Sequence, residues 1–169
     1  RLENLPRIDE GPRASAHLHK AAADFLGLPA ALPIAAGAGD AAASAIGIGA
    51  INDGDGFISL GTSAQYFVTT KRFRPRPNQM IQALSHGLPG LWYQVAALLN
   101  GASPLGWLNG ILPDGNIQKL LQRTERRYAG PGRLLFLPYL SGERTPHNDP
   151  AARAAFHGLH AGTTQEDLA

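Results

Sequence analysis

Apolar stretches along the chain are separated by breaks rich in glycine and proline, and this pattern predicts a mixture of strands and helices. Short apolar stretches rich in branched or aromatic residues favour strands, and longer periodic stretches favour helices. The predicted strands cover residues 32–36, 57–60, 65–70, 80–85, 91–99 and 133–140. The predicted helices cover residues 15–26 with Ser15 as the cap, 41–48, 102–112 and 117–128, and a capping pattern at residues 163–166 predicts the start of another. This mixture predicts an α/β fold.

Two of the breaks carry residues suited to phosphate chemistry. At the first, an apolar run ends at Gly37-Ala38-Gly39 and an alanine-rich helix begins at Asp40. At the second, a predicted strand ends at the turn Gly61-Thr62-Ser63. A carboxylate can take the proton of a hydroxyl group, and a glycine turn can donate backbone amides and side-chain hydroxyls to anionic oxygens. Together the two breaks indicate chemistry on a phosphate group.

Both breaks also have a plain structural interpretation, which position alone favours. Asp40 could be an N-cap that accepts from the first free amides of the helix and stabilises it by about 1 kcal/mol. A carboxylate saturated by helix amides would be a poorer base. Gly61-Thr62-Ser63 could be an ordinary β-turn.

The turn before Asp40 also fits G-x-G-x-x-A, a pattern of dinucleotide-binding proteins. That pattern calls for an acid at the end of the next strand, about 20 residues further on. Ser59-Leu60-Gly61 stands there instead, and the charge of Asp40 within the turn would repel a pyrophosphate. A nicotinamide-dependent oxidoreductase is therefore the weaker hypothesis.

Composition and charge exclude several further classes of function. The 169 residues suffice for one domain with a core, and 15 Lys+Arg against 13 Asp+Glu give a net charge of +2. Basic residues cluster only at residues 71–76 and 123–127, without a row of stacking aromatic rings, which argues against a nucleic-acid partner. The chain has no cysteine, so disulfides and thiol catalysis are excluded. Its six histidines form no set of metal ligands, and we expect no protein-held metal.

The ends and the apolar centre of the chain bear on location. Residues 28–51 are long and largely apolar, but two prolines and Asp40 argue against a membrane span. The first four residues lack the apolar core of a signal peptide, so we expect a cytoplasmic protein. The chain begins without methionine, and we interpret it as a piece of a longer protein.

The segment Ser141–Pro150 follows the last predicted strand and is dense in polar side chains. We expect a solvated loop, pinned by a Glu143–Arg144 or an Arg144–Asp149 pair. A charged loop directly after a buried strand could alternatively lie at the mouth of a cleft.

Four segments, taken together and in order, resemble the FGGY family of carbohydrate kinases. They are residues 36–42, 59–63, 83–90 and, above all, the stretch FLPYLSGERTPHNDP at residues 136–150. The resemblance extends over nearly the whole chain, and the last segment is specific because of its length. It implies an actin-like (ribonuclease H-like) ATPase fold with two lobes around a cleft. Residues 1–53 would be the end of the first lobe and residues 54–169 the start of the second.

The resemblance implies transfer of the ATP γ-phosphoryl group to a sugar hydroxyl, with D-xylulose as the favoured acceptor. Asp40 matches the family's catalytic base and would contact the sugar. Gly61, Thr62 and Ser63 match the second phosphate loop, and Ala102, by a weaker match, lies where relatives approach the nucleoside. Mg²⁺ would spread the charge of the phosphates. The implied partners are a sugar and ATP, with neither nucleic acid nor membrane, and a homodimer is compatible with this interpretation.

The chain also departs from the family pattern. Ala38 stands where the family has a glycine, Ala41 where it has an asparagine, and Ala64 where glycine is frequent. The first phosphate loop, most sugar-binding residues and the adenine contact lie outside this sequence, so we expect the isolated chain to be inactive. Two alternatives stay open: the same chemistry on another acceptor such as ribulose, glycerol or gluconate, and a non-catalytic actin-like module that binds a nucleotide or a sugar.

Overall fold

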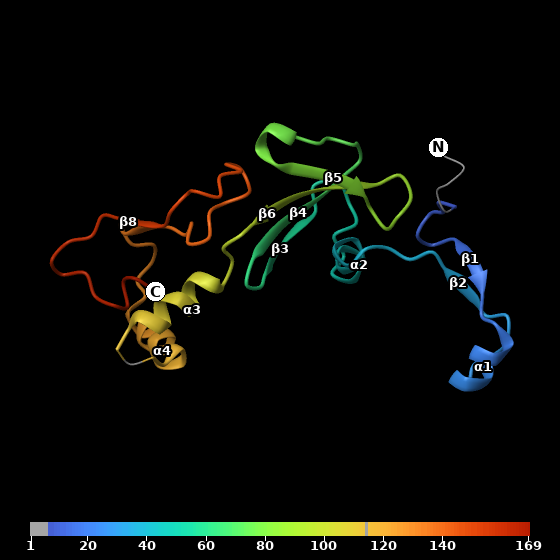
Figure 1. Cartoon of the computed structure of the whole chain (residues 1–169), viewed down its shortest axis with the longest axis horizontal. Helices are drawn as coiled ribbons and strands as arrows, with labels where there is room; N and C mark the ends of the chain where they lie inside the picture. The colour runs from blue at the N-terminus through green and yellow to red at the C-terminus, as the bar shows by residue number, and fades with distance from the viewer. Residues whose placement is uncertain (1–6, 114) are drawn as a thin grey trace. The chain divides into compact units, whose positions relative to one another are not determined.

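A computed structural model of the chain describes residues 7–113 and 115–169. It contains both strands and helices, as Figure 1 shows. Its N-terminal part contains, in order, β1 (Ala14–His17), α1 (Lys20–Leu26), β2 (Pro33–Ala35), α2 (Asp40–Gly47), β3 (Gly56–Leu60) and β4 (Ala64–Thr70). The remainder contains the short 3₁₀ helix η2 (Pro77–Gln79), then β5 (Ile81–Ser85), β6 (Trp92–Leu98), α3 (Ser103–Ile111), α4 (Ile117–Arg127), β7 (Leu135–Leu137) and β8 (Ala155–His157).

The largest sheet has four strands in the order β3-β4-β6-β5. Two smaller sheets are antiparallel pairs, β1 with β2 and β7 with β8. The chain divides into two compact units. The first takes the residues up to Phe57, together with Phe67–Pro75 and Ala83–Gln94, and the second takes Ile58–Tyr66, Arg76–Gln82 and Val95–Ala169.

The core of the first unit is an aromatic stack around Phe67. This side chain is 1% exposed and stacks between Phe57 and Tyr93, with ring centroids 4.7 Å and 4.4 Å away. His86 meets the same ring edge-on at 6.2 Å. Beside the stack, the buried Thr69 hydroxyl donates to the Ala50 carbonyl over 2.6 Å, so a polar group in the core is satisfied.

The core of the second unit lies between its two helices and its small sheet. Leu108 of α3 and Leu120 of α4 are both buried. Phe136 of β7 stacks on its cross-strand partner Phe156 of β8, with centroids 4.3 Å apart, and lies parallel to Trp107 of α3 at 6.2 Å. Cross-strand aromatic pairs of this kind stabilise a short two-stranded sheet that would otherwise be marginal.

Most predicted elements are confirmed, and the first helix is a correction. Residues 15–26 do not form one helix, because Ala14–His17 pairs as β1 with β2 and only Lys20–Leu26 is helical. The cap is therefore His19, whose Nδ1 accepts from the Ala21 amide at 3.2 Å, and not Ser15. The strand expected at residues 133–140 is limited to Leu135–Leu137, and the helix start expected at residues 163–166 is a turn held by Asp167.

Replacing Phe67 with alanine should lower the free energy of unfolding by about 3–5 kcal/mol, since it removes the central ring of a buried stack. Phe25→Ala is the matched control, because Phe25 is 88% exposed and the same atoms are lost there. Chemical denaturation of both variants measures the difference. Equal losses would contradict the assignment of the core to Phe67.

Candidate functional site

Asp40 is the first residue of α2, and its carboxylate is exposed. The N-cap of the helix is Gly39, which has extended backbone angles and no side chain to cap with. The Asp40 carboxylate accepts the Ala41 amide over 2.8 Å. Asp40 is therefore not the N-cap, and the carboxylate is not saturated by helix amides. The pKa of the Tyr93 phenol is raised, first by burial and second by the negative charge of the Asp40 carboxylate.

The turn that presents Asp40 is held by backbone contacts between glycines. Gly37 has φ of +81°, which suits glycine, and its amide donates to the Gly11 carbonyl over 3.0 Å. A Cβ on Gly11 would lie 2.6 Å from the Gly87 carbonyl oxygen, and one on Gly87 would lie 3.0 Å from the Cβ of Ala38. Side chains at these positions would push the turn and its neighbours apart. The start of α2 is thus positioned by three backbones in close contact.

A pocket of about 420 Å³ opens beside this turn, wholly within the first unit. It contains one ion-paired acid, Asp9, whose carboxylate lies 2.7 Å from Arg7 and 3.4 Å from Arg13. The pocket reaches Gly39, the residue directly before Asp40. Its lining consists of Ile8, Asp9, Glu10, Gly11, Arg13, Gly37, Ala38, Gly39, Ser85, His86 and Gly87.

The turn Gly61-Thr62-Ser63 belongs to the second unit and joins β3 to β4. The chain just before α3 lies against it. The Ala102 amide donates to the Gly61 carbonyl over 2.8 Å, and the Gly101 amide donates to the Thr62 carbonyl over 3.0 Å. A Cβ on Gly101 would be 2.5 Å from the Ser63 carbonyl group, so only glycine permits this approach. The structure thus brings together four of the five predicted site residues.

These contacts use the carbonyl groups of the turn and leave donors available. Thr62 and Ser63 are exposed, and within residues 7–113 and 115–169 their amides and hydroxyls have no hydrogen-bond partner. A turn that presents free amides and hydroxyls can bind anionic oxygens. The backbone therefore fits the phosphate groups that the sequence pattern indicates. Asp40, the fifth predicted residue, lies in the other unit.

Most residues of the loop Ser141–Pro150 are exposed, as its composition predicts, but Gly142, Glu143 and Thr145 are buried. Glu143 is 2% exposed, and its Oε1 accepts the Leu99 amide over 2.8 Å and the Arg144 amide over 2.7 Å. The backbones of Glu143 and Asp149 exchange two hydrogen bonds of 2.9 Å and 2.8 Å, which close the loop on itself. Backbone groups, rather than the expected pairs of Arg144 with Glu143 or Asp149, hold it in place.

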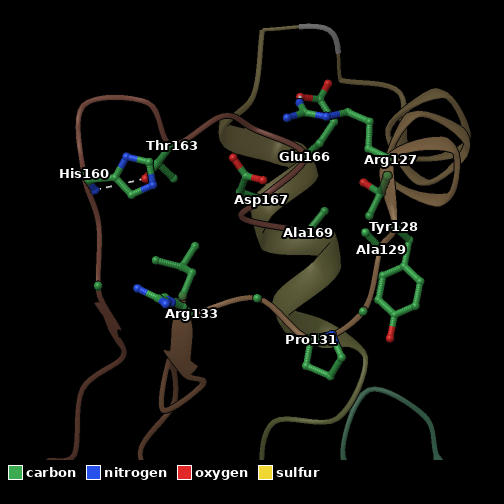
Figure 2. A pocket seen from close by; sticks show the side chains of 15 residues that line it. Arg127, Tyr128, Ala129, Pro131, Arg133, His160, Thr163, Glu166, Asp167 and Ala169 are labelled. Carbon is green, nitrogen blue, oxygen red and sulfur yellow. Dashed lines mark hydrogen bonds and ion pairs between the residues drawn. The ribbon is translucent and has the colours of Figure 1, made fainter.

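A second pocket, of about 460 Å³, lies in the second unit beside the end of α4 (Figure 2). Figure 2 shows Arg127 and Glu166 pointing toward each other, and an ion pair of 3.1 Å joins them. Glu166 also pairs with Arg123 over 3.0 Å. The pKa of Glu166 is lowered by its own backbone amide first, and then by Thr164 and the two arginines. Glu166 is thus paired with two arginines, and the Asp167 carboxylate accepts the Thr164 amide and hydroxyl over 2.7 Å and 2.9 Å.

Two general features of the described residues bear on function. In residues 7–113 and 115–169, no three His, Cys, Asp or Glu side chains are grouped so that they could hold a metal ion. None of the helices in the same ranges has both the length and the apolar character needed to cross a bilayer.

Comparison with known proteins decides the family. Residues 56–169, more than half of the chain, match the FGGY family of carbohydrate kinases, C-terminal domain. The chain belongs to the FGGY family of carbohydrate kinases. The family resemblance carried by residues 36–42, 59–63, 83–90 and 136–150 is thereby confirmed.

Relatives of this FGGY chain include the xylulose kinase of Escherichia coli (strain K12), 35% identical over 157 residues. That match covers 93% of the chain and 32% of the relative. A solved structure from Brucella ovis, titled as that of a xyloylose kinase, superposes with a TM-score of 0.89 at 39% identity, covering 96% of this chain and 34% of that one. The gluconate kinase structure from Lactobacillus acidophilus gives 0.81 at 26% identity over 99% of this chain and 34% of that one.

The chain thus spans about a third of the length of the relatives that it matches. These neighbours confirm that it is part of an actin-like ATPase fold. Sequence analysis located the two breaks at Asp40 and at Gly61–Ser63. It missed the buried role of Glu143 and the contact of Gly101 with Ser63. The glycine after Asn100 was a local signal for the contact, whereas nothing near Glu143 distinguished it from an exposed acid.

Gly101→Ala should lower the free energy of unfolding by about 1–3 kcal/mol, because the new methyl group must displace the Ser63 carbonyl. Gly106→Ala in α3 is the matched control. A Cβ on Gly106 would have no atom within 4 Å, and alanine there should raise stability by about 0.5–1 kcal/mol. Denaturant titration measures both changes. An equal gain in the two variants would contradict the close approach at Gly101.

Stability should also fall as the pH is lowered through 6.5, in part because of His86. Burial lowers the pKa of His86 below its ordinary value of 6.5, and the Ala50 carbonyl opposes this only partly. Below pH 6.5 the unfolded chain therefore takes up a proton that the folded chain resists, and the folded state loses stability. Denaturation of His86→Gln between pH 7.5 and pH 5 should show a smaller loss than the parent. His17→Gln, at an exposed site, is the control and should keep the parental slope.

Proposed function

We propose that the protein containing this chain transfers the γ-phosphoryl group of ATP to a hydroxyl group of a sugar, with D-xylulose as the acceptor. The proposal rests on two features found together in a chain of this family. One is an exposed, incompletely bonded carboxylate at the start of α2, and the other is a turn with free donors at Thr62 and Ser63. Relatives named xylulose kinase support D-xylulose in particular.

Asp40 acts as the general base in this proposal. Its carboxylate accepts the proton of the attacking hydroxyl group, and the hydroxyl oxygen then attacks the phosphorus atom in line with the departing ADP. The exposure of the carboxylate supports this role, because the sugar must reach it. The pocket that ends at Gly39 gives the sugar a place next to the base.

Thr62 and Ser63 bind the phosphate oxygens of the nucleotide through their amides and hydroxyls, and Gly61 lets the backbone approach closely. The Ala102 amide does not bind the nucleotide in this proposal, since it is already bonded to the Gly61 carbonyl. Ala102 therefore fixes the turn, while its exposed side chain can still lie against the nucleoside. Mg²⁺, which would arrive bound to ATP, supplies charge neutralisation at the phosphates.

We further propose the lobe boundary at residues 53 and 54, which the start of the family match at residue 56 supports. An active cytoplasmic enzyme needs the parts of the protein that lie outside this chain, and a homodimer is compatible with it. Gluconate is the second acceptor that we propose, because the superpositions fit it as well as xylulose. The gluconate kinase and the xylulose kinase of Lactobacillus acidophilus superpose on this chain equally well, both with a TM-score of 0.81.

Asp40→Asn in the full-length protein should lower kcat about 10²–10⁴-fold, because the amide cannot take the hydroxyl proton. The dissociation constant of ADP should change by less than about threefold, since Asp40 is not among the proposed phosphate ligands. Asp24→Asn, at a surface carboxylate paired with Lys20, is the control and should keep parental turnover.

A coupled assay of ADP release measures this with D-xylulose, ribulose, glycerol and gluconate as acceptors. Parental turnover by Asp40→Asn would refute the base assignment. If turnover is greatest with another acceptor, that acceptor replaces D-xylulose as the proposed substrate. If no sugar is phosphorylated, the result favours a non-catalytic module that binds a nucleotide or a sugar.

A further inference from the structure

The described residues contain one buried acid that the proposed mechanism does not use. Glu143 is 2% exposed, and a buried carboxylate is costly unless hydrogen bonds compensate it. Its Oε1 accepts two backbone amides, from Leu99 and Arg144, at 2.8 Å and 2.7 Å. Such bonds to a charged acceptor are stronger than neutral ones. The bond to Leu99 links positions 44 residues apart, so it joins the 141–150 loop to the end of β6.

Three further contacts reinforce this joint. The buried Asn100 side chain donates to the Gly142 carbonyl over 2.9 Å. The Thr145 amide donates to the Ala97 carbonyl and its hydroxyl to the Met80 carbonyl, each over 3.3 Å. Gly142 itself has φ of +77°, and a Cβ there would be 2.7 Å from Pro150 Cα. The loop is therefore closed on itself and bonded to residues 97–100.

The same strand end leads directly to the phosphate turn. Leu99, held by Glu143, is followed by Asn100, held by Gly142, and then by Gly101 and Ala102. Gly101 and Ala102 in turn bond to the carbonyl groups of Thr62 and Gly61 at 3.0 Å and 2.8 Å. Residues 99–102 therefore link Glu143 to the Gly61–Ser63 turn by consecutive hydrogen bonds. All of these residues belong to the second unit.

We propose that Glu143 is a positioning residue for nucleotide binding: it fixes residues 99–102, and these fix the backbone of the Gly61–Ser63 turn. It touches neither the sugar nor the nucleotide. The inference rests on the proposed function, because it assigns the turn to the phosphates of ATP. Loss of the Oε1 acceptor would leave the amide of the half-buried Leu99 without a partner, and residues 99–102 would shift to find a new one.

The test is the dissociation constant of a non-hydrolysable ATP analogue with Mg²⁺, measured by calorimetry on the full-length protein. Glu143→Ala should raise this constant about tenfold, which corresponds to about 1.4 kcal/mol. Glu143→Gln keeps an acceptor oxygen in place and should stay within about threefold of the parent. In the coupled assay, the KM for ATP should follow the dissociation constant while the KM for the sugar stays unchanged.

Leu120→Ala separates positioning from general destabilisation. Leu120 is buried in the same unit, in α4, and its truncation should lower the denaturation midpoint without changing the dissociation constant. If Glu143→Ala does not fold, Asn100→Ala removes the bond to Gly142 and should weaken binding in the same direction. Unchanged binding in Glu143→Ala, or in Asn100→Ala where that variant replaces it, would overturn the inference, as would equal losses in Glu143→Ala and Glu143→Gln.

The outcomes for the two proposals can be told apart. A parent protein that binds the analogue but phosphorylates no sugar would refute the proposed function, while the dissociation constants would still decide the role of Glu143. A parent protein that does not bind the analogue would overturn both.

Discussion

The arrangement of the second unit depends on the contact between two backbones at Gly101. Because this residue has no side chain, the chain before α3 can lie against the carbonyl group of Ser63, closer than any Cβ would allow. Two backbone hydrogen bonds then hold the turn at Gly61 and Thr62 by their acceptors. The amides and hydroxyls of Thr62 and Ser63 take no part in this contact, so they can donate to an anion. Carbonyl groups of the turn thus support it, and the donors that we propose for phosphate binding are the amides and hydroxyls of Thr62 and Ser63.

In the first unit, backbone contacts likewise position Asp40. Asp40 begins α2, and the glycine before it supplies the extended backbone that a helix entry needs. The turn is positioned by Gly11 and Gly87 through close backbone packing, so no side chain has to bond to the carboxylate in order to place it. The carboxylate that we propose as the general base therefore keeps its oxygens accessible. An N-cap in the same place would have been bound to the helix and less able to accept a proton.

Elements that depend on neighbouring residues could be predicted from the sequence. Elements and contacts that depend on residues far away in the chain could not. The start of α2 near Asp40 could be predicted because an apolar strand, a turn with two glycines and an alanine-rich helix follow one another directly. β1 could not, since Ala14–His17 has small residues with no distinctive period and becomes a strand only by pairing with β2. The burial of Glu143 could not be predicted either, because it too depends on a distant partner. Its partner Leu99 lies 44 residues away, and no pattern around position 143 reveals that amide.

The use of main-chain donors at the turn has a consequence for how this region can vary. A hydroxyl group lost from Thr62 or Ser63 removes one donor, but the amide beside it is independent of the side chain. A methyl group gained at Gly101 displaces the whole turn and every donor on it. Mutations should therefore be tolerated less well at Gly101, which offers no group to a ligand, than at Thr62 and Ser63, which we propose as phosphate ligands.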